Sequence, residues 1–319
     1  MTRQDAAEEV DCLVIGGGPS GLSFAHAAAA GGLKRVLLIE RQAGLGGVPR
    51  HCGHSPFGMR EFGRVLDGAT YAKRLADRAR DAGARLLPAH AAVRLGPDGS
   101  VDLATPDGPR KITARAIVLA TGTREATRAA RLLPGRRLRG ILNTGALQDL
   151  VYLRHMPPFS RPLIVGSELV SLSALLTCRS SGMRPVAMID DVWRTPHLWP
   201  AFRAARLLGV PFLVGTSIAD IRGTTDVTSV VLERGDRRWE VACDGIVLSG
   251  RFTPEASLAR SSAIPLDPVR TGPRTDHNGR TERAGVYAIG NAVGTVRTAG
   301  QCWSEGRRVA RIVLAQLGA

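Results

Sequence analysis

The chain has 319 residues, a length typical of two domains. Hydrophobic residues make up 44% and charged residues 22%, which is ordinary usage for a folded protein and excludes a disordered chain. No apolar run reaches the roughly 18 residues of a membrane-spanning helix. The first twelve residues contain several acids and no apolar stretch, so we expect no secretory signal and a cytoplasmic location.

The net charge of +15 invites a nucleic-acid interpretation. However, all but three of the 43 basic residues are Arg, and they are spread along the whole chain without a basic block. With 4 Trp, 3 Tyr and 7 Phe, there are also few rings on which bases could stack. We therefore predict no nucleic-acid binding. The charge is interpreted as a compositional preference for Arg over Lys, with a positive surface that faces an anionic cofactor or an acidic partner as the alternative.

The five cysteines are scattered and form no C-x-x-C pair; they are Cys12, Cys52, Cys178, Cys243 and Cys302. This pattern argues against a zinc ribbon, an iron–sulfur cluster or a disulfide framework within this chain. We expect no metal site.

The first motif lies near the N-terminus. Residues 11–16 are an apolar run of strand length that leads into Gly16-Gly17-Gly18-Pro19-Ser20-Gly21, a G-x-G-x-x-G pattern. Residues 20–30 then predict a helix, and residues 35–39 predict a second strand that ends at Glu40. This arrangement of strand, glycine turn, helix and acid predicts a dinucleotide-binding unit.

Each residue type in this motif has a physical role. Gly16 permits the tight turn, Gly18 lets a diphosphate approach the backbone, and Gly21 allows close packing of helix on strand. The helix N-terminus, at Pro19 and Ser20, offers N–H groups to the phosphates. Glu40 is placed to accept hydrogen bonds from the ribose hydroxyls.

Further segments favour FAD as the dinucleotide. A glycine-rich loop, residues 44–47, follows Glu40 closely and can pass over an extended cofactor. Residues 117–122 predict an apolar strand ending in Ala-Thr-Gly, and residues 285–291 predict another that ends in Gly290-Asn291. An amphipathic helix is expected over residues 70–82, with strands over 84–96 and 99–104. The stretch of residues 193–200, rich in Trp and Pro, is interpreted as a packed loop, with a partner-binding surface as the alternative.

The opening of the chain is repeated farther on. Gly166 corresponds to Gly16, and Asp190 corresponds to Glu40 at the end of the second strand of the repeat. At the most informative positions, however, the second and third glycines are replaced by Glu168 and Ser171. A carboxylate about 4 Å from a phosphate costs about 1 to 4 kcal/mol, which argues against ordinary NAD(P)H binding. Two interpretations stay open: an adenine nucleotide held in another pose by Gly166, Ser167 and Asp190, or a domain kept as scaffold and docking surface.

Together these motifs resemble the two-dinucleotide-domain FAD flavoproteins of the pyridine nucleotide–disulfide oxidoreductase type. The resemblance implies an α/β fold with two Rossmann-like domains. The FAD-binding domain would comprise residues 9–125 and 251–319, and a degenerate NAD-type domain, residues 126–250, would be inserted in it. Asn291 stands where the family has an Asp on the ribityl chain, and the helix beginning near Ala299 would face the flavin. The implied FAD-binding residues are Gly16, Gly18, Pro19, Ser20, Gly21, Glu40, Arg41, Gly46, Gly47, Val48, Ala92, Ala120, Thr121, Gly122, Gly290, Asn291, Ala299 and Gly300.

Residues 46–54, 56–62, 166–171 and 299–306 resemble a narrower group. This group comprises the alpha subunits of opine oxidases, hydrogen cyanide synthase and dye-linked proline or hydroxyproline dehydrogenases. The resemblance implies an amino-acid-oxidase-like flavoprotein partner that oxidises a C–N bond. Many members continue into a cysteine-rich [2Fe–2S] domain, whereas this sequence stops at Ala319, so the resemblance places such a cluster on a separate small protein.

The sequence leaves three functions open. The chain is expected to be the FAD-holding, electron-relaying subunit of a multi-subunit amine, imino-acid or opine dehydrogenase. The first alternative is a free-standing NAD(P)H-dependent flavin reductase in which Cys52, beside His51 and His54, is a redox thiolate of lowered pKa. A packing role for Cys52 is the simpler interpretation, since a redox thiol needs a reductant. The second alternative is a non-catalytic scaffold that binds an adenine nucleotide.

Overall fold

The computed structural model describes residues 8–193 and 198–318. The expectations that rest on residues 1–7, the missing secretory signal, and on residues 194–197 of the Trp- and Pro-rich stretch lie outside this described part. Within it, the helices are too short or too polar for any of them to cross a membrane.

The chain forms two compact units. Unit 1 contains the segments up to residue 50, from 55 to 124, and from 253 onward, and unit 2 contains residues 51–54 and 125–252. The short segment 51–54 differs from the arrangement expected from the sequence, because its residues contact unit 2: Cys52 lies against Gln148, and Gly53 lies against the ring of Tyr152.

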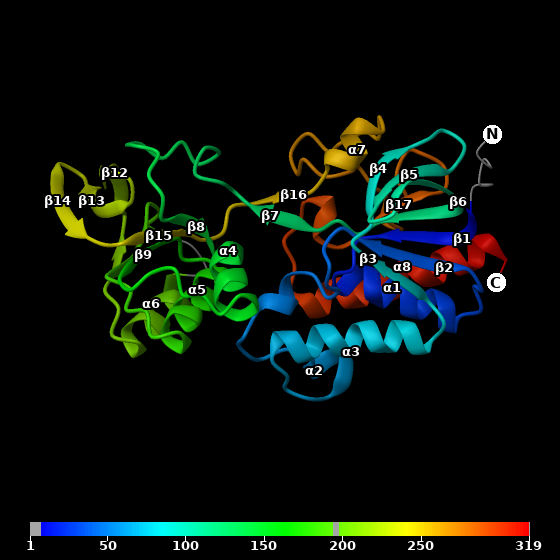
Figure 1. Ribbon diagram of the computed structural model, residues 1–319, viewed down its shortest axis with the longest axis horizontal. Coiled ribbons are helices and arrows are strands. Elements are labelled where there is room, and N and C mark those ends of the chain that lie inside the picture. Colours follow the sequence, from blue (N-terminus) through cyan, green and yellow to red (C-terminus); the bar gives the residue numbers. More distant parts are fainter. Residues whose placement is uncertain (1–7, 194–197, 319) are drawn as a thin grey trace. The chain divides into compact units, whose positions relative to one another are not determined.

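Unit 1 is built on a seven-stranded sheet with the order β3-β2-β1-β6-β5-β4, in which β17 also pairs with β6 (Figure 1). Strands β3, β2, β1, β6 and β17 are parallel, while β5 and β4 are antiparallel to their neighbours. The bounds are β1 Glu8–Ile15, β2 Val36–Glu40, β3 Arg85–Pro88, β4 Ala91–Leu95, β5 Ser100–Thr105, β6 Gly108–Leu119 and β17 Val286–Ala288.

The helices of unit 1 cover the two faces of this sheet unequally. Figure 1 shows the long helices α1, α3 and α8 on one side and the short α7 on the other. Alternate strand residues such as Val14 and Leu38 pack with Phe24 of α1, Tyr71 of α3 and Val309 of α8. The alternation follows from the period of two in a strand. The helix bounds are α1 Pro19–Ala30, α2 Met59–Phe62, α3 Gly68–Asp81, α7 Ser257–Ser261 and α8 Ala299–Leu317, with 3-10 turns at Val48–His51 and Gly290–Val293.

Unit 2 repeats this plan with fewer elements. Its parallel sheet has the order β11-β10-β9-β15-β8, accompanied by an antiparallel meander of β12, β13 and β14. The strand bounds are β8 Ile141–Asn143, β9 Pro162–Val165, β10 Ala187–Asp190, β11 Phe212–Val214, β12 Ser217–Gly223, β13 Val227–Arg234, β14 Arg237–Ala242 and β15 Gly245–Leu248. The helical segments are α4 Thr144–Gln148, a π-helical turn at Asp149–Leu153, α5 Leu169–Ser180 and α6 Leu198–Leu207.

The two sheets correspond strand by strand. The order β3-β2-β1-β6-β17 in unit 1 matches β11-β10-β9-β15-β8 in unit 2, and α1 and α5 follow the equivalent strands β1 and β9. The chain passes between the units through β7 (Thr123–Glu125) and β16 (Phe252–Pro254), which pair as a two-stranded ribbon. The predicted fold class, α/β with two Rossmann-like domains, is confirmed.

Candidate functional site

The glycine turn of unit 1 is tightly packed against the end of β6. Gly16 has φ +116°, and a Cβ atom built on it would lie 2.3 Å from the carbonyl oxygen of Ala120. A Cβ on Gly21 would lie 2.0 Å from the carbonyl oxygen of Gly16. Any side chain at either position would push the helix away from the strand, so these two glycines are required by the local packing.

Gly18 differs from Gly16 and Gly21, because there is room for a side-chain atom at its Cα. A Cβ atom on Gly18 would meet a single atom within 4 Å, the Cα of Gly47 at 4.0 Å. Gly18 is the N-cap of α1 and provides no side-chain cap, and Pro19 occupies the first turn. The first N–H groups of a helix have no partner within it, so this turn offers donors beside an open space of the kind a diphosphate fills.

Glu40 is held in position at the end of β2. Its two carboxylate oxygens accept hydrogen bonds from the backbone N–H of Gly17 at 2.8 Å and of Gln42 at 2.9 Å. Each carboxylate oxygen has a second lone pair, so the group can still accept a ribose hydroxyl. Its neighbour Arg41 extends to the carboxylate of Glu255, with Nη1 3.5 Å from Oε2.

The glycine loop after Glu40 is tied back to the turn. The N–H of Gly46 donates to the carbonyl of Gly17 at 2.7 Å, and a Cβ on Gly47 would lie 2.9 Å from the Cα of Gly18. The remaining implied residues of this half lie on other segments of unit 1. Val48 begins the 3-10 turn that follows the loop, Ala92 is on β4, and Ala120-Thr121-Gly122 follows β6.

At the other end of the expected cofactor path, Asn291 is engaged with a loop. Its Oδ1 accepts from the N–H of Arg297 at 2.8 Å, and its Nδ2 donates to the carbonyl of Arg297 at 3.2 Å. The side chain thereby fixes the segment just before α8. A capping box of Thr298 and Gln301 then begins α8, which leaves the N–H groups of Ala299 and Gly300 at the exposed start of a 19-residue helix. A ribityl contact by Asn291 stays a prediction.

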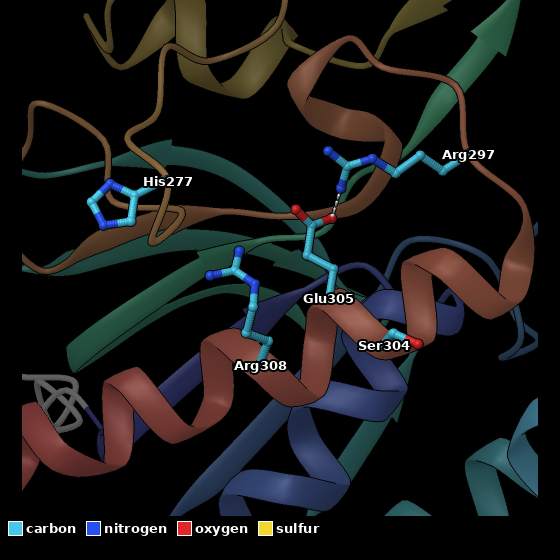
Figure 2. A pocket seen from close by; sticks show the side chains of 5 residues that line it. All are labelled: His277, Arg297, Ser304, Glu305 and Arg308. Atoms are coloured by element: carbon cyan, nitrogen blue, oxygen red, sulfur yellow. Dashed lines mark ion pairs between the residues drawn. The ribbon is translucent and has the colours of Figure 1, made fainter.

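Glu305 supports the same loop from inside α8. Its carboxylate accepts from the N–H of Gly290 at 2.7 Å and forms an ion pair of 2.5 Å with Arg297. The pair borders a hollow of about 480 Å³ that is also lined by Ser304, Arg308 and His277. Figure 2 shows these five side chains. Sequence reasoning missed Glu305, because no spacing rule connects it with the strand end that it supports.

The second glycine turn has the first glycine only. Gly166 has φ +120°, and a Cβ on it would lie 2.8 Å from the carbonyl oxygen of Ser249, as expected for the counterpart of Gly16. Ser171, in place of the third glycine, is fully buried, and its hydroxyl donates to the carbonyl of Glu168 at 2.6 Å.

Glu168 fills the position of the second glycine with a carboxylate that is bound internally. Its Oε1 accepts from the N–H of Arg251 at 3.1 Å, and a Cβ on Gly250 would lie 2.4 Å from its carboxyl carbon. The Gly250 N–H donates to the buried carboxylate of Glu125. Protein carboxylates therefore occupy the N–H groups of the loop that follows β15, and the Glu168 side chain stands where the first turn has only the hydrogen of Gly18.

The acids after β10 are also engaged. Asp190 is buried, and its Oδ1 accepts from the N–H of Val192 at 3.1 Å. Asp191 pairs with Arg251 at 2.9 Å. Ser167 is buried as well. Binding of an adenine nucleotide by Ser167 and Asp190 would require these side chains to be uncovered.

All five cysteines are buried. Burial raises the pKa of the Cys52 thiol to about 12, and its hydrogen bond to Gln148, at 3.6 Å, does not offset this. Burial likewise raises the pKa of Cys302 to about 11. The lowered pKa that a redox role of Cys52 requires is absent, since the nearby charge of Glu125 acts in the same direction as burial.

The fold and these two turns define a class: a two-domain dinucleotide-binding flavoprotein. The family model "Pyridine nucleotide-disulphide oxidoreductase" matches residues 10–306. The chain belongs to this family and is an FAD-dependent oxidoreductase. The donors at the first turn and the open space above Gly18 fit FAD, whereas the second turn does not fit a dinucleotide diphosphate.

The chain is 28% identical over 334 residues to an opine oxidase subunit of Rhizobium meliloti (strain 1021), an alignment that covers 97% of this chain and 71% of that protein. The structure of T. acidophilum thioredoxin reductase is similar with a TM-score of 0.79 at 18% identity, covering 98% of this chain and 100% of that one. The structure of L-proline dehydrogenase from P. horikoshii has a TM-score of 0.74 at 19% identity, covering 99% of this chain and 57% of that one.

Proposed function

We propose that this chain is the FAD-holding, electron-relaying subunit of a multi-subunit amine, imino-acid or opine dehydrogenase. The observation that carries the proposal is the contrast between the two turns. The first keeps its donors and its open space, and the second is closed by Glu168. A flavoprotein that does not take electrons from NAD(P)H needs another donor, and a partner protein can provide one.

The likeness to a protein that is itself named as one subunit of opine oxidase supports this assignment, because that name implies at least one further subunit. The partners we propose are an amino-acid-oxidase-like flavoprotein and a small [2Fe–2S] protein. The cytoplasmic location of the complex stays a prediction.

The residues of unit 1 would bind and orient the cofactor. Gly18 and the N-terminus of α1 would hold the diphosphate, Glu40 the adenosine ribose, and the start of α8 the pyrimidine edge of the flavin. When bound, FAD supplies the ability to accept two electrons and pass them on singly. Substrate oxidation would take place in the partner.

The two alternatives have less support. A flavin reductase that uses Cys52 would need a reactive thiolate, but burial raises the pKa of this thiol to about 12. A scaffold that holds an adenine nucleotide in unit 2 would need Asp190, whose carboxylate is buried and bonded to its own loop.

The test begins with the tagged chain purified from its native host under mild conditions. We expect a yellow preparation whose flavin absorbance near 450 nm does not bleach on anaerobic addition of NADH or NADPH. Mass identification of co-purified proteins should reveal an amino-acid-oxidase-like flavoprotein. The reconstituted complex, but not the isolated chain, should reduce an artificial dye with an amine or imino-acid substrate.

Each of these measurements has a result that would contradict the proposal. Rapid bleaching by NADH, together with turnover that Cys52→Ser abolishes, would establish the flavin reductase instead. A colourless chain that added FAD cannot reconstitute, but that retains bound ATP or ADP, would establish the scaffold. Full dye reduction by the isolated chain would show that no partner is needed for substrate oxidation.

A further inference from the structure

Two arginines from different strand ends converge on one buried carboxylate in unit 1. The Nη1 atoms of Arg41 and Arg124 lie 3.5 Å and 3.8 Å from the same oxygen, Oε2 of Glu255. The Glu255 side chain is only 9% exposed, whereas the two arginine side chains are 62% and 61% exposed. The carboxylate is therefore fixed inside, and the two guanidinium groups extend from it toward solvent.

The backbone around Glu255 is anchored to the Ala-Thr-Gly turn. The N–H of Glu255 donates to the carbonyl of Gly122 at 2.9 Å, and the hydroxyl of Thr121 donates to the carbonyl of Glu255 at 2.7 Å. The hydroxyl of Ser257 donates to the Oε1 of Glu255, which leaves Oε2 for the arginines. The position of Glu255 is thus set by contacts with Gly122, Thr121 and Ser257 that do not depend on either arginine.

The cluster extends across the end of β1. In the sheet, β1 lies between β2 and β6. Arg41 directly follows β2, and Arg124 lies just beyond β6. Glu255 lies two residues before α7, which packs on the face of the sheet opposite to α1 (Figure 1). A dinucleotide that crosses the glycine turn at the end of β1 therefore has the N-terminus of α1 on one side and this cluster on the other.

The charge of the cluster suits an anionic ligand. Two guanidinium groups and one carboxylate leave one net positive charge. Burial on its own would raise the pKa of Glu255, but the Ser257 hydroxyl and the charges of Arg124 and Arg41 outweigh it and lower the pKa below its ordinary value. Glu255 is therefore ionised at neutral pH and keeps both arginines in place.

We propose that Arg124, together with Arg41, binds the negatively charged diphosphate of FAD where it joins the adenosine. Glu255 is the residue that positions both arginines. The inference rests on the proposed FAD site and adds two residues, Arg124 and Glu255, that the sequence motifs do not indicate. Arg41 directly follows β2, whereas Arg124 lies within β7, and no spacing in the sequence connects either of them with Glu255.

The two roles open to Glu255 predict effects of opposite sign. If Glu255 acted only as a negative charge near the cofactor, its removal would strengthen FAD binding. If it positions the arginines, Glu255→Gln weakens FAD binding although it removes a negative charge. The measurement is the dissociation constant of FAD for the deflavinated protein, followed by quenching of flavin fluorescence at two salt concentrations.

We expect Arg124→Gln to weaken FAD binding about tenfold at low salt, as for the loss of one charge contact in a partly exposed site, and to reduce the salt dependence of binding. Arg124→Lys should recover part of the affinity, and Glu255→Gln should weaken binding about threefold to tenfold. Arg110→Gln, an exposed arginine elsewhere in unit 1, is the matched control and should leave the affinity unchanged. Thermal unfolding of each variant shows whether the fold is retained.

Unchanged FAD affinity in folded Arg124→Gln, or tighter binding in Glu255→Gln, would overturn the inference while leaving the FAD site itself intact. If Glu255→Gln does not fold, the FAD affinities of Arg124→Gln and Arg124→Lys alone show whether the arginine cluster binds FAD. A wild-type chain that binds no FAD would remove the proposed function and this inference together.

Discussion

The two glycine turns of this chain began from one pattern and now differ at one decisive position. Both start with a glycine at strongly positive φ, Gly16 and Gly166, pressed against the next strand of its sheet. In the first turn, Gly18 leaves the space above the helix N-terminus open. In the second, Glu168 fills it with a carboxylate bound to the N–H of Arg251.

The difference separates two requirements that act on the glycines of such a turn. The glycine that the backbone requires is kept in both copies, because without it the strand could not turn into the helix. The glycine that only the diphosphate requires is lost in one copy. Glu168 instead accepts a hydrogen bond from the N–H of Arg251, in the loop that follows β15.

The strongest way to break the comparison is to transfer the carboxylate to the first turn. Gly18→Glu should weaken FAD binding by about 10-fold to 1000-fold, because it places a like charge and a side chain where the diphosphate lies. The measurement is the ratio of flavin to protein absorbance after purification, together with the dissociation constant for FAD. Val65→Glu adds the same charge at an exposed site of unit 1 and should bind FAD normally. A fully yellow Gly18→Glu protein would contradict the assignment of this turn.

The reverse exchange should reopen the second turn. The double variant Glu168→Gly, Ser171→Gly frees the N–H of Arg251 and the start of α5, and we expect ADP and NADH to bind at least about tenfold more tightly than to wild type. Calorimetric titration with ADP measures this directly. Asp236→Gly removes an exposed acid elsewhere in unit 2 and controls for net charge alone. Equal ADP affinity in wild type and the double variant would show that Glu168 is not what closes the site.

The sequence was sufficient for the parts of the site that depend on local geometry. The spacing of Gly16, Gly18 and Gly21 predicted the turn, and the mismatch at Glu168 predicted its closure in the repeat. The sequence could not show which groups the ends of long side chains contact in the folded protein. Glu305 bonds to Gly290, and Glu255 joins Arg41 to Arg124, through contacts between segments that are far apart in the chain.

The two units also differ in the pKa of a buried carboxylate, Glu255 in unit 1 and Glu125 in unit 2. Burial would raise the pKa of Glu255, but the Ser257 hydroxyl and the charges of Arg124 and Arg41 outweigh it and lower this pKa. Burial raises the pKa of Glu125, and the hydrogen bonds from Gly145 and Gly250 do not offset this. In the folded state Glu125 therefore binds its proton more tightly than in the unfolded chain. Protonated Glu125 therefore contributes to the free energy of unfolding at acid pH. This contribution is lost as the pH rises from the ordinary glutamate pKa, about 4, through the raised pKa of the folded state.

Glu125→Gln removes this titration. The free energy of unfolding of the variant, measured with urea at several pH values, should therefore improve relative to wild type as the pH rises from about 4 to about 8. Because Gln has one carbonyl oxygen, it loses one of the two hydrogen bonds, so the variant should be less stable than wild type at the acid end by about 1 kcal/mol. A difference between the two proteins that is constant with pH would show that Glu125 has the same proton affinity folded and unfolded.

The smallest expected effect concerns Cys52, whose thiol lies in the buried part of unit 2 against Gln148. Cys52→Ser should change dye reduction by the reconstituted complex less than about twofold, while the buried hydroxyl costs about 1 kcal/mol of stability. Since burial raises the pKa of this thiol to about 12, iodoacetamide should modify it in the native protein far more slowly than in the urea-unfolded chain. Fast alkylation in the native state, with loss of turnover, would instead place a reactive thiolate in the electron path and make the closed second turn irrelevant to how this protein is reduced.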